Sequence, residues 1–82
     1  MTATKITNYL VNEYGECRHD AYAMSEAIND MAEEIDANKR ELMELLLNNR
    51  PITALYTHSY GFHTANGRGI INNLKGKYYE YN

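Results

Sequence analysis

The feature that most constrains this chain is an apolar repeat that runs through residues 21–45. Successive apolar positions are alternately 3 and 4 residues apart, which is the heptad spacing of a helix with one continuous apolar edge. No glycine or proline interrupts the repeat before Pro51, and only one position in it, Asn38, is polar. The apolar positions are Ala21, Met24, Ile28, Met31, Ile35, Leu42 and Leu45. The pattern predicts one long acidic helix over residues 17–49.

A helix of that length is too long for this chain to cover by itself. About 30 helical residues span about 45 Å, whereas a compact domain of this size is about 26 Å across. We therefore expect a homodimer in which two copies pair along a coiled-coil seam, with Asn38 as an interfacial amide that fixes the register. The alternative is a break near residues 36–39 that gives an antiparallel helical hairpin with Asn38 in its loop. The expected dimer interface consists of Met24, Ile28, Met31, Ile35, Asn38, Leu42 and Leu45.

The first and last segments of the chain have different patterns. Residues 1–15 predict a short helix, because Ile6, Leu10 and Tyr14 recur at helical spacing and Gly15 suits a left-handed C-cap. Residues 51–82 are rich in Thr, Tyr, Ile and Gly, and their first part alternates with a period of two. We predict a basic, tyrosine-rich β segment there.

The β segment is expected to form a hairpin or a three-stranded meander. Asn66-Gly67 is a strong hairpin signal, and KYYEY near the end of the chain could add a third strand. The predicted fold class is therefore α+β. A helical alternative exists, because Ile52, Leu55 and Tyr56 follow Pro51 at helical spacing, and it would make the chain an all-α helical bundle.

Length and composition limit the class of protein. Eighty-two residues form one domain at most. Cys17 is the only cysteine, which excludes a disulfide within one chain and, with no signal-like apolar stretch after Met1, predicts a cytoplasmic protein. The longest apolar run, Leu45 to Leu47, is too short to cross a bilayer.

Charge is distributed unevenly. The net charge is −3, but residues 1–49 hold ten acidic residues against four basic ones, giving −6, and residues 50–82 carry +3. Glu26, Asp30 and Glu33 fall on the outward side of the long helix without a basic partner at helical spacing, which is typical of either a solvated face or a surface for a cationic partner. The predicted partner-binding residues are Glu26, Asp30, Glu33, Glu34, Asp36 and Tyr60.

These features favour a non-enzymatic protein-binding module. The mechanism we expect is occlusion, in which the acidic helix covers the basic, nucleic-acid-binding surface of a partner protein. Short, acidic, single-domain chains without an enzyme motif are typical of inhibitors from phages and mobile elements, anti-CRISPR and anti-restriction proteins included. The alternative is a small dimeric regulator that binds nucleic acid through its C-terminal cations and tyrosines. Those residues are Arg68, Lys75, Lys77, Tyr78, Tyr79 and Tyr81.

No motif predicts catalysis, a metal or a cofactor. Glu16 and His19 have the Glu-x-x-His spacing of di-metal bundles, but only one such pair exists, so a dimer would have to supply the second. His58 and His63 lie five residues apart, which places them on opposite faces of a strand. Cys17 is two residues from His19, too far around a helix for mutual activation. The segment from Asn66 to Gly69 lacks the lysine of a phosphate-binding loop.

Overall fold

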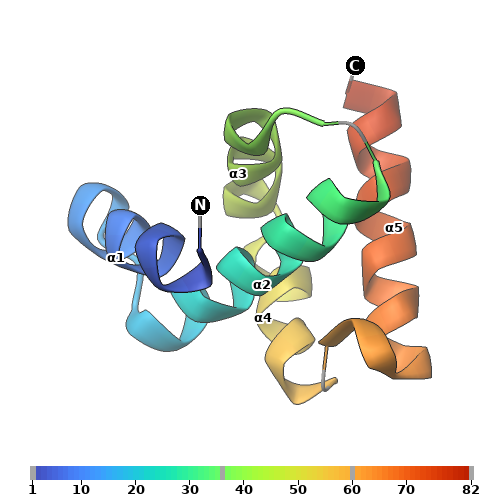
Figure 1. Ribbon diagram of the computed structural model, residues 1–82, viewed down its shortest axis with the longest axis horizontal. Coiled ribbons are helices and arrows are strands. Elements are labelled where there is room, and N and C mark those ends of the chain that lie inside the picture. The colour runs from blue at the N-terminus through green and yellow to red at the C-terminus, as the bar shows by residue number, and fades with distance from the viewer. Residues whose placement is uncertain (1, 36, 60, 82) are drawn as a thin grey trace.

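Helices account for nearly all of the chain in the computed structural model, which describes residues 2–35, 37–59 and 61–81. Helix α2 crosses the centre of the molecule between α1 and α5 (Figure 1) and packs against all four other α-helices. No described residue lies in a strand, so the predicted α+β fold and its β-hairpin or meander are wrong, and the all-α alternative fits. The elements are α1 (Ala3–Tyr14), α2 (Arg18–Glu34), α3 (Lys39–Asn48), α4 (Arg50–His58), the 3-10 helix η1 (Gly61–His63) and α5 (Ala65–Tyr81).

Helix α1 agrees with its prediction. The Thr2 side chain caps its first turn by accepting a hydrogen bond from the Lys5 amide, and Gly15 ends it with a φ of 67°. Its buried face meets α2 through Ile6 and Leu10, and through a 3.0 Å hydroxyl pair between Thr7 and Ser25. Both hydroxyls also donate to a carbonyl of their own helix, Thr7 to Ala3 and Ser25 to Tyr22, so the two buried polar groups have partners.

The predicted continuous rod over residues 17–49 is wrong. Helix α2 ends at Glu34, and the backbone of Ile35 is extended, with φ −129° and ψ 146°. Asn38 then begins α3 as its N-cap, where its Oδ1 accepts hydrogen bonds from the amides of Arg40 at 2.8 Å and Glu41 at 3.3 Å. Asparagine competes well for free backbone amides, and for that reason it favours N-caps over helix interiors. Asn38 is polar because it caps a helix.

The apolar edge of the repeat lies inside a single chain. Met24, Ile28, Met31 and Leu42 are essentially inaccessible to solvent, and Leu45 is nearly so. The edge is divided between α2 and α3, which pack against each other and against α4 and α5. The chain as a whole measures 29 × 27 × 21 Å. The residues expected at a dimer interface therefore form the core of one subunit, apart from the half-buried Ile35 and the exposed Asn38.

The C-terminal third is helical because its apolar residues follow helical spacing once the buried positions are known. Thr53 and Tyr56, three residues apart on α4, are both fully buried, and a strand would place them on opposite faces. On α5 the buried Ile71 and Leu74 are also three residues apart, with the half-buried Tyr78 four residues further along. The alternation of apolar residues with a period of two, from which strands were predicted, is therefore not the periodicity of the buried residues.

The Asn66-Gly67 pair, predicted as a hairpin turn, lies in the first turn of α5. The Thr64 hydroxyl caps that turn by accepting the Gly67 amide at 3.0 Å. A Cβ atom added to Gly67 would lie 1.5 Å from the carbonyl oxygen of Gly61, which itself has a φ of 69°. Gly67 is needed because the chain passes this close to itself between η1 and α5, and glycine is favoured at position 61 by its positive φ.

Two further glycines of α5 have no such role. An added Cβ at Gly69 or Gly76 would meet nothing within 4 Å. Each costs the helix about 1 kcal/mol relative to alanine. No contact within the fold accounts for glycine at these two positions.

Candidate protein-binding surface

The outward face of α2 carries the acidic residues that the sequence placed there. We define the α2 surface as the half-exposed or exposed side chains on this face, which recur at i, i+4, i+7, i+8 and i+11 along the helix. In the view of Figure 1, helix α2 has α3 above it and η1, in orange, below it. The members of the α2 surface are Tyr22, Glu26, Asn29, Asp30 and Glu33.

Tyrosine hydroxyls hold two of these carboxylates in place. Tyr22 donates to Glu26, and this bond raises the pKa of the Tyr22 hydroxyl because the carboxylate disfavours a phenolate. Tyr56, fully buried on α4, donates to Oδ2 of Asp30. Burial first, and then the Asp30 carboxylate, raises the pKa of Tyr56 far above its ordinary value. Both tyrosines therefore remain donors at neutral pH.

Two hollows flank the α2 surface. One, of about 230 Å³, lies between α2 and η1 and is lined by Glu26, Asp30 and His63, among others. The other, of about 390 Å³, lies on the α3 side and includes Glu33 and Lys39. The Lys39 ammonium donates to Asn29 at 3.1 Å, and no salt bridge joins Lys39 to Glu33. Each hollow offers at least one carboxylate to a side chain from outside.

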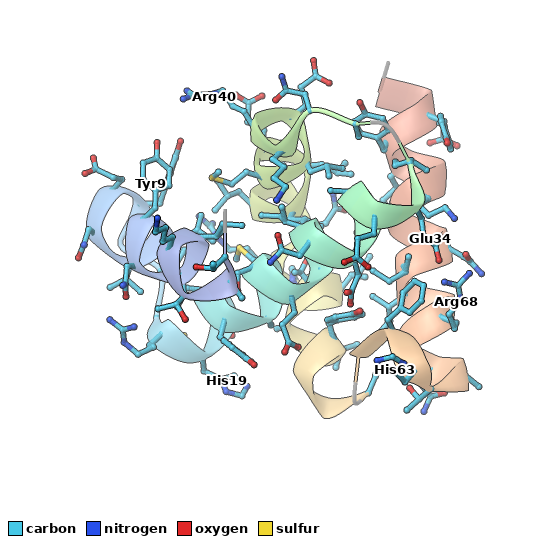
Figure 2. The ribbon with its side chains drawn as sticks, in the orientation of Figure 1. Tyr9, His19, Glu34, Arg40, His63 and Arg68 are labelled. Atoms are coloured by element: carbon cyan, nitrogen blue, oxygen red, sulfur yellow. The ribbon has the colours of Figure 1, made fainter. Side chains whose placement is uncertain are left out.

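Glu34, predicted as part of the binding face, is instead used within the fold. Its two carboxylate oxygens bind Arg68 and Lys75, which lie seven residues apart on α5. Figure 2 shows Glu34 at the end of α2, directed toward Arg68. Hydrogen bonds from Lys75 and Arg68 lower the pKa of Glu34. The acidic first half and the basic last third of the chain thus neutralise each other at this contact.

Two more carboxylates outside the α2 surface have internal partners. Glu16 is buried and accepts Nε and Nη2 of Arg50, each at 2.5 Å. Glu41 accepts the Tyr78 hydroxyl at 3.1 Å. Among the residues described, Glu26, Asp30 and Glu33 make no ion pair with any lysine or arginine of the chain. The predicted residues Asp36 and Tyr60 lie outside the described part of the chain.

Two of the three C-terminal cations, Arg68 and Lys75, have partners within the fold. Arg68 binds Glu34 and also stacks on Phe62, with its guanidinium carbon 4.4 Å from the ring centroid. Lys75 points to the same carboxylate, while Tyr79 is exposed elsewhere on α5. The side chain of Tyr81 is not among those described.

The residues considered for metal or nucleophilic chemistry are apart. Glu16 precedes α2, so it and His19 do not share a helix face, and Glu16 is occupied by Arg50. Cys17 is an exposed free thiol that caps α2 through a 3.5 Å contact from the Asp20 amide. His63 lies edge-on to Phe62, and the His58 side chain is not described. No group of three or more described His, Cys, Asp or Glu residues could hold a metal ion.

Comparison with known proteins gives no relative from which to infer a role. No family model, curated protein or solved structure matches the chain. In the described part of the chain, no helix has the length and apolar content needed to cross a membrane.

Sequence analysis did not identify Tyr22, Asn29 or Tyr56 as parts of this surface. A signal for Tyr22 was present, because it lies four residues before Glu26 on the same helix face. The contact of Lys39 with Asn29 requires the chain to reverse between α2 and α3, and a continuous rod excludes it. Nothing in the sequence pairs Tyr56 with Asp30, since the two lie 26 residues apart.

Proposed function

We propose that this protein is a non-enzymatic binding module whose α2 surface docks on a basic surface of another protein. The observation that carries the proposal is the different use of its carboxylates. Glu16 and Glu34 are ion-paired within the fold, whereas Glu26, Asp30 and Glu33 lie beside two hollows without a cationic partner from the described chain.

The geometry suits lysine or arginine side chains of the partner. An arginine entering the hollow beside η1 would meet Glu26 and Asp30, and charge-assisted hydrogen bonds of this kind are among the stronger polar contacts. Both carboxylates are half-buried, so their attraction for a cation is screened less than that of fully exposed groups. Tyr22, which is 45% exposed, adds an aromatic ring at one end of the surface.

The partner class that we favour is a nucleic-acid-binding protein, because its phosphate-binding groove presents clustered cations. An acidic protein covering such a groove would block nucleic acid from it. Small size and net acidity are consistent with an inhibitor of host defence from a phage or mobile element, of the anti-CRISPR or anti-restriction type. The free thiol at Cys17 is consistent with action in the cytoplasm.

The alternative, a nucleic-acid-binding regulator, has less support. Two of its three cations, Arg68 and Lys75, are already paired with Glu34. A specific protein–nucleic acid interface needs several cations free to replace counterions on phosphates.

The test is affinity capture from the native host with a charge-reversed variant. We expect E26K/E33K to fold normally and to lose the captured partner. The matched control is E13K/E44K, which changes the net charge equally but on α1 and α3, at exposed positions outside the α2 surface. The control should retain the partner. Retention of the partner by E26K/E33K, or equal loss from both variants, would contradict the proposal.

A further inference from the structure

A groove of about 540 Å³ lies between α4 and α5, outside the α2 surface. None of its lining residues is charged, and most of its lining is apolar. Leu55, on its α4 wall, is 56% exposed, an unusual exposure for a leucine beside two half-buried isoleucines. Those isoleucines are Ile52 on α4 and Ile70 on α5.

Gly69 lines this groove on its α5 side, and the same exposed face of α5 continues to Gly76. Gly69 and Gly76 are seven residues apart and lie at the centre of the exposed face of α5. Space beside both is open, so the fold does not require glycine at either position. Glycines in this arrangement allow a second helix to approach the α5 backbone closely.

We propose that this face is a self-association surface on which a second copy of the chain packs. The two α5 helices run antiparallel about a two-fold axis near Asn72 and Asn73. Gly69 of each copy then lies opposite Gly76 of the other. Leu55 and Ile52 of each copy cover the second helix from the side of the groove. Asn73 meets Asn73 and Asn72 meets Asn72 across the axis, and asparagine pairs of this kind hydrogen-bond to each other.

Charge complementarity favours a second copy in the antiparallel direction. The first turn of α5 has no acidic residue and its last turn no basic one, so no charged residue in these two turns compensates the helix dipole. The antiparallel register places Glu80 of one copy opposite Asn66, in the first turn of the other copy. The carboxylate then lies at the positive end of the partner helix, where it is favourable.

The same face also avoids like-charge repulsion. Each copy has a net charge of −3, and its outward carboxylates lie mainly on other helices. The groove is lined by uncharged residues, so two acidic chains can approach there with little mutual repulsion. This surface is distinct from the buried heptad edge, which is covered by the chain itself.

The proposal is tested by the solution mass of the full chain over a dilution series, measured by light scattering. We expect wild type to reach twice the 9.5 kDa of one chain as concentration rises. The double variant G69Q/G76Q should remain at 9.5 kDa, because its side chains occupy the space that the second helix needs. Glutamine is a better helix former than glycine, so this variant should keep or increase its helical content. The control N12Q, at an exposed position of α1, should dimerise as wild type does.

Orientation is tested by disulfide cross-linking in a background that lacks the native thiol. C17S/N73C should form a covalent pair on oxidation, because position 73 faces itself across the axis. C17S/N66C should not, because Asn66 faces Glu80.

Three outcomes would overturn the proposal. Wild type at 9.5 kDa at every concentration would show that the chain does not self-associate. Dimers that persist in G69Q/G76Q would place the interface elsewhere. Equal cross-linking at positions 66 and 73 would indicate parallel helices. None of these outcomes bears on the α2 surface, so the two proposals fail separately.

Discussion

Helices α2 and α5 have the same length, 17 residues each, but their solvent-facing sides are opposite in character. The outward face of α2 carries carboxylates that tyrosines hold in position, on a helix without glycine. The outward face of α5 carries glycines and asparagines, which are poor helix formers. A helix whose other side is buried in the core can keep its structure with either kind of solvent-facing side. On the α5 face, Gly69 and Gly76 lower the stability of the helix relative to alanine, and no contact within one subunit explains them.

The largest expected change in stability comes from comparing a glycine on the buried side of α5, Gly67, with one on its open side, Gly76. Gly67→Ala should destabilise the protein by about 4 kcal/mol or prevent folding, because its Cβ would overlap the Gly61 carbonyl at 1.5 Å. Gly76→Ala, the same change on the open side, should stabilise dilute protein by about 0.5–1 kcal/mol. Urea denaturation of both variants measures this. Two changes of the same sign would mean that the contact between η1 and α5 is not as close as the structure shows.

A smaller effect tests why α2 stops where it does. Asn38→Ala should cost about 1 kcal/mol, because two amides of α3 lose their cap. Asn38→Asp should retain most of that stability, since aspartate caps equally well. Thermal unfolding followed by circular dichroism compares the two variants with wild type. A gain in stability for Asn38→Ala would instead indicate a continuous helix through this position.

The smallest effect concerns the contact that joins the two helices. Because the folded pKa of Glu34 is lowered, its ion pairs stabilise the protein above the unfolded pKa, about 4.3. That contribution is lost as the pH falls through the lower, folded value. We therefore expect wild type to be more stable than E34Q near about pH 7 and the difference to shrink below about pH 4.

The neighbouring variant E33Q serves as the control for this pH dependence. Glu33 is exposed and has no ion pair within the described chain, so E33Q should track wild type across the same range. A constant difference between wild type and E34Q at both pH values would show that Glu34 stabilises the fold by packing and not by charge.

The sequence predicted the apolar positions of the core correctly but not what covers them. Met24, Ile28, Met31, Leu42 and Leu45 are buried, as their spacing required. The error was to treat Asn38 as part of the repeat when Asn38 and Glu41 have the spacing of a capping box. Polar residues within a heptad pattern are therefore worth testing first as caps. The dimer expected along that seam was inferred from the continuous rod, whereas most of its residues are buried within one chain.

For the candidate surface, helical spacing predicted which side chains face outward but not which residues from other helices they contact. Glu26, Asp30 and Glu33 face outward because each lies away from the buried stripe of α2. The sequence could not show that Glu34 meets Arg68 and Lys75, because those contacts join residues 34 and 41 positions apart. Nor could it show that Asn66-Gly67 starts a helix, since its hairpin signal is local and the Gly61 contact is not.

The close passage of the chain at Gly61 and Gly67 has a consequence for large-scale mutagenesis. Substitutions at Gly67 should be lost whenever the folded protein is selected, because a Cβ there would overlap the Gly61 carbonyl, and Gly61 should accept few residues because its φ is positive. Gly69 and Gly76 should accept many residues when only expression is selected, and few when growth depends on what the protein does. Saturation libraries screened both ways would therefore separate glycines kept for the fold from glycines kept for assembly.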